Sequence, residues 1–232
     1  MFEINPKKLI KAGVHFGHLT SKWNPNIKPF IFMKKMGMHI IDITKTIKEI
    51  KKACFFLKKI AKSGKKILFV STKKQIKDLI AYNANKVNMP YISNRWLGGL
   101  LTNMFTVRRA LKKIEIINKK KKDGTYNILS KKERLLINRL QIKLENSLGS
   151  IVNMPYLPSA LIIVDINKEH IAVKEGQILK IPIVGIVDTD SDPKKVNFPI
   201  PGNDDSSKSI NIILNYLTQS ILEGLKLYNE NK

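Results

Sequence analysis

The sequence predicts an α/β fold in which helices cover both faces of a parallel sheet. Short apolar runs alternate with segments of helical periodicity, an order typical of parallel sheets. The runs are continuously apolar, as expected for strands that are buried on both faces. Because 43% of the 232 residues are hydrophobic, the chain can bury a sizeable core. The predicted strands are 66–70, 89–92, 161–165 and 183–187, with 198–200 as a short fifth strand at an edge, where proline is tolerated.

The segment before the first of these strands predicts a hairpin followed by a long helix. Residues 30–33 and 38–41 are apolar and flank a short basic turn that ends in glycine, which favours a β-hairpin. Residues 44–62 then have helical periodicity. The side chains expected to face inward from this helix are Ile47, Ile50, Cys54, Leu57 and Ile60.

Three more helices are predicted between and after the strands. Thr72 and Gln75 have capping-box spacing, which predicts a helix from there to about residue 85. A second helix covers about 169–179. The last helix is the clearest, and Asp204 and Asp205 are suited to its amino-terminal cap. Its apolar stripe consists of Ile210, Ile213, Leu214, Leu217, Ile221, Leu222 and Leu225.

An insertion of about 50 residues separates the second and third strands. Residues 105–118 and 130–148 both have helical periodicity, and Ser130 and Glu133 have capping-box spacing. We interpret the insertion as a helical hairpin, or two-helix antiparallel coiled coil, that carries a basic tip at 119–122. The expected seams are Val107, Leu111 and Ile114 on one helix and Ile137, Leu140 and Leu144 on the other. The chain therefore divides into an α/β domain of residues 1–104 and 150–232 and an inserted hairpin of residues 105–149.

The charge of the chain is large and unevenly distributed. The net charge is +24, from 42 basic and 18 acidic residues. Residues 161–232 hold 8 basic and 10 acidic residues, a net of −2, so residues 1–160 hold 34 and 8, a net of +26. An AT-rich genome would enrich lysine throughout the chain and does not explain this asymmetry. The asymmetry of charge favours a chain with one polyanion-binding part and a nearly neutral remainder. No apolar run reaches membrane-span length, and no lipidation signal is present.

A nucleotide-dependent enzyme is the first alternative, since an open parallel sheet has a crevice at the carboxyl ends of its strands. The sequence contains no G-x-G-x-x-G motif, and 63–66 cannot end a Walker loop because position 59 is lysine. Residues 71–74 could hold a phosphate at a helix amino terminus, but that phosphate could equally belong to RNA. No serine, histidine and aspartate order or pair of catalytic carboxylates stands out. We therefore expect no enzymatic activity and no small-molecule substrate.

Three aspartates at alternate positions of 188–192 copy the start of a calcium loop. The pattern then fails, because Pro193 occupies the position of the required glycine. Capping and turn-forming roles are the expected alternative. A single Mg²⁺ held by Asp188, Asp204 or Asp205 stays open.

The histidines and the single cysteine also lack a complete site. His15 and His18 would share one face of a helix, but no third zinc ligand is apparent, so we expect hydrogen bonding within a packed turn. Cys54 lies in a predicted buried helix and is expected to be a core thiol in a reducing compartment. The sequence thus predicts no metal site here and no cofactor.

The segment 94–103 is the most unusual in the chain. It combines Arg95, Trp96 and the pair Gly98 and Gly99 directly after a predicted strand. An arginine beside an indole is suited to pairing with phosphate and stacking on bases. Paired glycines allow a sharp turn or a close approach to another surface. An ordinary loop with Trp96 packed on the core is the alternative interpretation.

Seven stretches of the chain form a recognisable series: 12–18, 22–25, 39–42, 68–75, 94–99, 182–189 and 200–205. Taken together and in this order, they closely resemble the bacterial-type ribosomal protein S-two family. The similarity extends from about residue 4 to residue 224 and is specific because the whole series occurs in order.

This resemblance implies a flavodoxin-like three-layer α/β/α sheet with an inserted coiled-coil hairpin. It also implies a non-enzymatic constituent of the small ribosomal subunit in the cytoplasm. Such a protein binds small-subunit ribosomal RNA near the junction of head and body and contacts other small-subunit proteins, including the large mRNA-binding protein. The RNA-binding candidates are Lys22, Trp23, Asn24, Lys28, Lys73, Lys74, Asn94, Arg95, Trp96, Thr102, Asn103 and Arg108.

Some of these candidates have a second interpretation. Trp23 and Trp96 could be core packing, which we favour for Trp96, whereas Arg95 and Asn103 are better candidates for direct contact. A protein-interaction adaptor that uses the hairpin without RNA is a third functional class. The +26 charge of residues 1–160 argues against such an adaptor.

Overall fold

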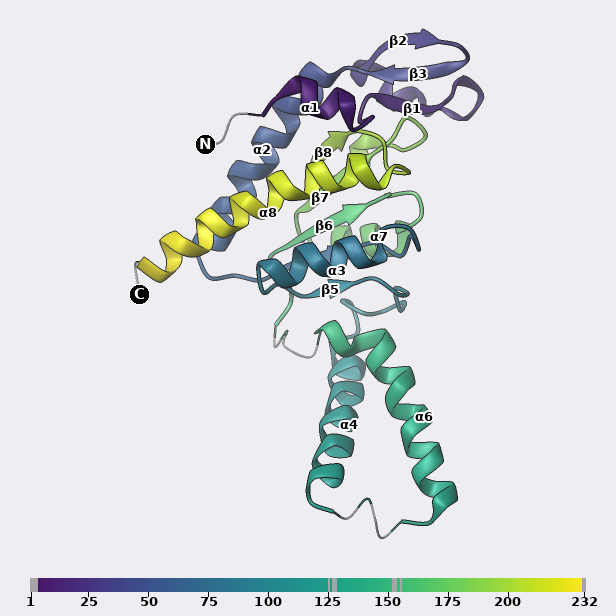
Figure 1. The fold of residues 1–232 in the computed structure, drawn as a ribbon, viewed down its shortest axis with the longest axis vertical. Coiled ribbons are helices and arrows are strands. Elements are labelled where there is room, and N and C mark those ends of the chain that lie inside the picture. The colour runs from purple at the N-terminus through teal and green to yellow at the C-terminus, as the bar shows by residue number, and fades with distance from the viewer. Residues whose placement is uncertain (1–3, 125, 127–128, 152–153, 155, 231–232) are drawn as a thin grey trace.

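The computed structural model of the protein describes residues 4–124, 126, 129–151, 154 and 156–230. Its centre is a five-stranded sheet in which neighbouring strands are all parallel (Figure 1). The strand order β5-β4-β6-β7-β8 corresponds to 2-1-3-4-5 along the chain, which is the flavodoxin-like order. The strands are β4 (Ile67–Val70), β5 (Tyr91–Ile92), β6 (Ala160–Val164), β7 (Ile183–Val187) and β8 (Phe198–Pro201).

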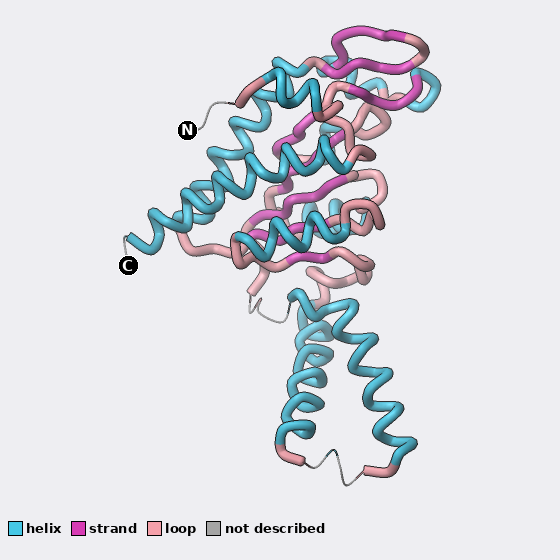
Figure 2. Tube along the Cα trace, viewed as in Figure 1, coloured by secondary structure: helices cyan, strands magenta, loops and turns pink. Residues whose placement is uncertain are grey.

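The sheet separates two hydrophobic cores because successive strand residues point to opposite faces. Phe69 and Ile162 belong to one core, and Leu68 and Ile163 to the other. The first core is covered by three helices, and the second by one helix together with the loop after β5 and the base of the insertion. Figure 2 shows this layering of helices and strands. The helices are α2 (Ile43–Lys62), α3 (Lys77–Lys86) and α8 (Ser207–Glu230) on the first face and α7 (His170–Ile178) on the second.

The two longest helices of the α/β domain, α2 and α8, lie against each other over much of their length (Figure 1). Gly224 permits this contact, because a Cβ atom there would lie 2.6 Å from the Lys58 carbonyl oxygen. Phe56 of α2 stacks on Phe198 of β8 at 4.4 Å between ring centroids, which anchors the pair to the sheet.

The amino-terminal residues form a second, antiparallel sheet with the order β1-β3-β2. It sits against the carboxyl ends of β7 and β8 (Figure 1). Thr189, which follows β7, accepts a hydrogen bond from the His18 backbone at its hydroxyl and from the Asn24 backbone at its carbonyl, both at 2.8 Å. The elements are α1 (Pro6–Lys11), β1 (Phe16–Leu19), β2 (Ile31–Lys35) and β3 (Met38–Ile41), with short 3₁₀ turns η1 (Thr20–Lys22) and η2 (Pro25–Phe30).

The insertion forms two helices, α4 (Met104–Lys122) and α6 (Lys131–Leu148), that extend away from the sheet and diverge toward their far ends (Figure 1). The 3₁₀ turn η3 (Gly149–Ile151) leads back to the domain. The predicted seam on α4 is buried, as expected. On α6 the expectation is wrong for Leu140, which is 44% exposed, because Gln141 faces α4 at this level and donates to Asn118 Oδ1 at 3.0 Å.

Most predicted elements are present, with one correction to the beginning of a helix and one to the type of an element. The predicted strands, the hairpin and the capping box of Ser130 and Glu133 are confirmed. The helix expected to begin near Thr72 begins at Lys77, because Thr72 binds a carboxylate instead of capping a helix. The pair His15 and His18 lies at a strand rather than on a helix. Among the described residues, no helix is both long and apolar enough to cross a bilayer.

Candidate nucleic-acid interface

The loop between β5 and α4 is organised by one buried carboxylate, Glu175 of α7. Its Oε1 accepts hydrogen bonds from Trp96 Nε1 at 3.0 Å and from the Gly99 backbone at 2.8 Å. Its Oε2 accepts from the Leu101 and Thr102 backbones at 2.9 and 3.1 Å and from the Thr102 hydroxyl at 3.3 Å. These bonds join the loop to α7 and fix its conformation.

The environment of Glu175 keeps it ionised. Desolvation by burial acts to raise its pKa, but the bonds from Trp96, Leu101, Thr102 and Gly99 outweigh burial and hold the pKa below its ordinary value. The carboxylate therefore stays a strong acceptor at neutral pH.

The two glycines of this loop have different roles. Gly99 has φ +84°, a left-handed conformation that side chains disfavour, so glycine is required there by the backbone. A Cβ atom on Gly98 would have no heavy atom within 4 Å among the described residues. Gly98 is therefore not required by internal packing, and its backbone is open to approach from outside.

The predicted contact residues around this loop lie in different environments. Trp96 is buried in the core, in agreement with the packing interpretation. Asn103 caps α4, since its Oδ1 accepts from the Thr106 backbone at 3.3 Å and the Thr106 hydroxyl at 2.9 Å. The exposed candidates of this region are Asn94, Arg95, Thr102, Asn103 and Arg108.

A second group of candidates lies in the turns η1 and η2 of the amino-terminal unit. Lys22 and Lys28 are exposed. Trp23 is half-buried, 5.1 Å from the His39 ring and beneath the Lys34 amine at 5.5 Å. Asn24 caps η2 by accepting from the Asn26 backbone at 2.9 Å. In this group the two lysines face outward, and the tryptophan and asparagine support the turns.

The two lysines after β4, Lys73 and Lys74, have opposite surroundings. The Lys73 amine lies 2.9 Å from Asp165, 2.6 Å from Asp204 and 2.9 Å from Asp205. Its side chain is only 13% exposed, whereas Lys74 is exposed. The charge of Lys73 is thus neutralised within the protein.

The carboxylates around Lys73 belong to a larger charged cluster at the carboxyl ends of the strands. Asp165 follows β6, Asp188 follows β7, and Asp204 and Asp205 follow β8, so all four gather at the carboxyl ends of parallel strands. His18 of β1 reaches into the same cluster, with ring nitrogens 3.2 Å from Asp188 and 3.3 Å from Asp205. The side chains of the protein itself occupy the place where related sheets bind ligands.

This cluster shifts the pKa values of its members strongly. Burial raises the pKa of Asp204 to about 7, with repulsion from Asp165 and Asp188 adding to the shift and Lys73 opposing it. The bond to Asp188 raises the pKa of His18 to about 9 despite partial burial. Burial acts to lower the pKa of Lys73, but the surrounding aspartates, Asp204 above all, raise it above its ordinary value.

The aspartates expected to cap and turn the chain do so only in part. Asp192 caps a short turn at Lys194 with a 3.0 Å bond, as expected. Asp204 and Asp205 bind Lys73 instead of capping α8 with their side chains. Among the residues that the structure describes, no group of three acidic, histidine or cysteine side chains is arranged to hold a metal ion.

Comparison with known proteins identifies the family. The model of a family described as "Ribosomal protein S2" matches residues 9–224, almost the whole chain. This chain belongs to the ribosomal protein S2 family. The S2 family is one of structural proteins, and the chain is not an enzyme.

Several bacterial members of the S2 family are similar to this chain over nearly its full length. The small ribosomal subunit protein uS2 of Karelsulcia muelleri is 62% identical over 218 residues, which cover 94% of this chain and 98% of the relative. The protein of the same name from Flavobacterium johnsoniae is 57% identical over 223 residues, covering 96% and 88%. That of Bacteroides thetaiotaomicron is 52% identical over 226 residues, covering 97% and 81%.

Three carboxylates that position the candidate residues of this S2-family chain were missed by sequence reasoning. Glu175 fixes the loop after β5, Asp165 binds Lys73, and Glu169 accepts from both the backbone and the hydroxyl of Thr72 at 2.6 Å. Asp165 also has φ +66°, in the left-handed region that aspartate tolerates. An acidic residue on the inward face of a predicted helix was the available signal for Glu175.

Proposed function

We propose that this constituent of the small ribosomal subunit binds small-subunit ribosomal RNA, near the junction of head and body, through cations on the carboxyl edge of its sheet. The observation that carries the proposal is the separation of charge within the fold. Lys22, Lys74 and Arg95 face outward, whereas half of the ten acidic residues of the carboxyl-terminal third are buried. The buried ones are Asp165, Glu169, Glu175, Asp188 and Asp204. Outward cations with few acidic neighbours are suited to pairing with phosphate.

The proposed footprint is smaller than the set of residues suggested by sequence. Its charged members are Lys22, Lys28, Lys74, Arg95 and Arg108, all of which are exposed. Asn94, Thr102 and Asn103 belong to the same loop as Arg95 and are also exposed. The amide groups of Asn94 and Asn103 add neutral polar groups to the footprint. We assign Trp23, Asn24, Lys73 and Trp96 supporting roles, because each is engaged within the protein.

Contacts with other small-subunit proteins, including the large mRNA-binding protein, are part of the proposal. The amino-terminal sheet supports it, because several apolar side chains there are exposed. Such side chains gain little from phosphate and are typical of protein contacts. They are Phe16, Phe32, Met33 and Met36.

The experiment for the proposed location is sedimentation of a cell extract at low salt in the native organism, with detection of this chain by mass spectrometry. We expect the chain to comigrate with small subunits in the cytoplasmic extract. Its recovery only among the slowly sedimenting proteins would refute the proposal.

The footprint is tested by the salt dependence of binding to purified small-subunit ribosomal RNA. Each phosphate contact contributes roughly 0.7–0.9 to the slope of log K against log salt. We expect Lys74→Gln and Arg95→Gln each to reduce the slope by about this amount. Lys62→Gln, at the carboxyl end of α2 and also exposed, is the matched control and should leave the slope unchanged.

A further inference from the structure

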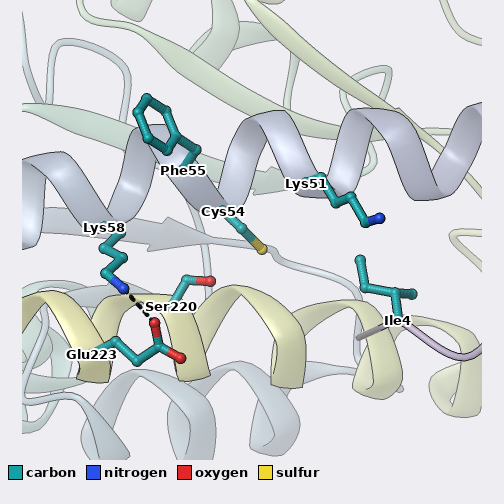
Figure 3. A pocket seen from close by; sticks show the side chains of 7 residues that line it. All are labelled: Ile4, Lys51, Cys54, Phe55, Lys58, Ser220 and Glu223. Atoms are coloured by element: carbon teal, nitrogen blue, oxygen red, sulfur yellow. Dashed lines mark hydrogen bonds and ion pairs between the residues drawn. The ribbon is translucent and has the colours of Figure 1, made fainter. Parts of the chain in front are cut away.

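A groove of about 300 Å³ runs between α2 and α8, on the face of the domain that these helices cover (Figure 3). Cys54 points toward α8 at its floor, beside Ser220, and Ile4 closes one end. At the other end, Lys58 bridges the two helices through a 2.5 Å ion pair with Glu223. The groove is therefore bounded by fixed helices and a cross-helix ion pair.

The lining of the groove is suited to a single large apolar side chain. An engineered apolar cavity of about 150 Å³ holds benzene, so this space is large enough for a leucine, methionine or phenylalanine side chain. The Cys54 thiol is unreactive, since burial raises its pKa to about 11. Phe55, at the rim, is 66% exposed and extends the apolar surface beyond the groove. A partner that covers both the groove and the exposed face of Phe55 must therefore be larger than one side chain.

The charge around the groove favours an acidic partner. Helix α2 contains seven lysines and one glutamate, and that glutamate, Glu49, pairs with Lys52 at 2.7 Å. Lys58 is paired with Glu223. Lys51 lines the groove and is exposed, and within the described part of the chain no ion pair to it is found. A carboxylate beside the inserted side chain would complete this arrangement.

We propose that the α2–α8 groove docks an acidic segment of a neighbouring protein, which inserts one large apolar side chain over Cys54 and pairs a carboxylate with Lys51. RNA would neutralise the lysines but would bring mainly phosphate and ribose to an apolar floor. The groove also lies along the α2–α8 face, whereas the proposed RNA footprint follows the carboxyl edge of the sheet. The inference rests on the proposed place of the chain among the proteins of the small subunit.

The first test uses an array of overlapping 15-residue peptides that cover the other small-subunit proteins of the same organism, probed with the full chain. We expect binding to be confined to peptides that combine net negative charge with a large apolar residue. Lys51→Glu and Phe55→Ala should each weaken binding to such a peptide at least about tenfold in fluorescence anisotropy. Lys59→Glu makes the same charge change on α2 outside the groove and should retain binding.

Two results would overturn the groove inference. One is an array without bound peptides, and the other is equal loss of binding in the Lys51→Glu and Lys59→Glu chains. A photo-crosslinking amino acid in place of Phe55, in assembled subunits, tests the class of partner. A peptide adduct supports the proposal, and an adduct only to RNA contradicts it. If the chain comigrates with small subunits and these tests fail, the groove inference fails while the proposed function stands.

Discussion

Replacing Lys73 by methionine should destabilise the fold severely while changing only one charge. The amine lies within 3 Å of Asp165, Asp204 and Asp205, and Asp204 is almost completely buried. Methionine has a similar length but no charge, so it would leave the buried carboxylates without their cation. Lys74→Met is the matched control, because that side chain is exposed one position further along.

The magnitude follows from the burial of the partners. Removing one member of a buried ion pair costs about 3–5 kcal/mol. The pair with Asp205 adds little, since that side chain is 62% exposed. For a chain of this length, 1 kcal/mol shifts the melting temperature by about 2–4 °C, so the melting temperature of the variant should fall by roughly 6–20 °C. The control should stay within about 0.5 kcal/mol of the wild type.

The assay is thermal and urea unfolding followed by circular dichroism, at pH 6 and at pH 8. Asp204 has a folded pKa of about 7, above its ordinary value of 3.8, so its contribution to stability is lost as pH rises through about 7. In the Lys73→Met chain the attraction that lowers the pKa of Asp204 is lost, so this pKa rises further. The decline of stability with rising pH then continues above pH 7. The deficit of the variant should therefore be larger at pH 8 than at pH 6. A deficit below about 1 kcal/mol, equal at both pH values, would refute the assignment of Lys73 to a structural role.

Three further predictions concern the loop after β5 and the junction of the two sheets. Glu175→Gln should lower the free energy of unfolding, measured in urea, by about 1.5–3 kcal/mol, because bonds to a buried carboxylate are lost. It should also shift the Trp96 fluorescence to longer wavelength, and unchanged fluorescence would contradict this prediction. Gly99→Ala should cost about 1–3 kcal/mol in the same assay because of its positive φ, whereas Gly98→Ala should be nearly neutral, and equal effects would exclude the backbone explanation. His18 has a folded pKa of about 9 against 6.5 unfolded, so its stabilising contribution is complete below pH 6.5 and lost as pH rises through 9. A His18→Gln chain should therefore show a flatter decline in melting temperature between these pH values. A decline identical to that of the wild type would contradict the pairing of His18 with the aspartates.

The sequence predicted the sheet because its strands are buried on both faces and have a continuous apolar pattern. Runs as short as Ile67–Val70 and Ile183–Val187 have the length of a strand and are too short for a typical helix. Phe16–Leu19 was missed, since it is short, only partly buried and contains glycine and histidine. The beginning of α3 was misplaced because Thr72 and Gln75 have capping spacing, but Thr72 binds Glu169 from a distant helix. Local capping signals do not reveal such a competitor.

The candidate site was predicted as a set of residue types but not as a surface. Arg95 and Lys74, two of the predicted contact residues, are exposed. Lys73 was grouped with Lys74 because the two are adjacent and alike in sequence. The difference between them arises from Asp165 and Asp204, which lie about 90 and 130 positions away in the chain. Whether any of these side chains contacts RNA remains the prediction that the salt-dependence experiment checks.

The sequence by itself determined the fold class, the inserted hairpin and the uneven charge, because periodicity, composition and capping are local properties of a chain. Only the tertiary structure decided which charges remain available to a partner. Parallel strands bring their carboxyl ends to one edge, and there Lys73 and His18 meet carboxylates from three strands. Burial in a medium of low dielectric constant makes that pairing strong, whereas Lys74 and Arg95 at this edge face outward.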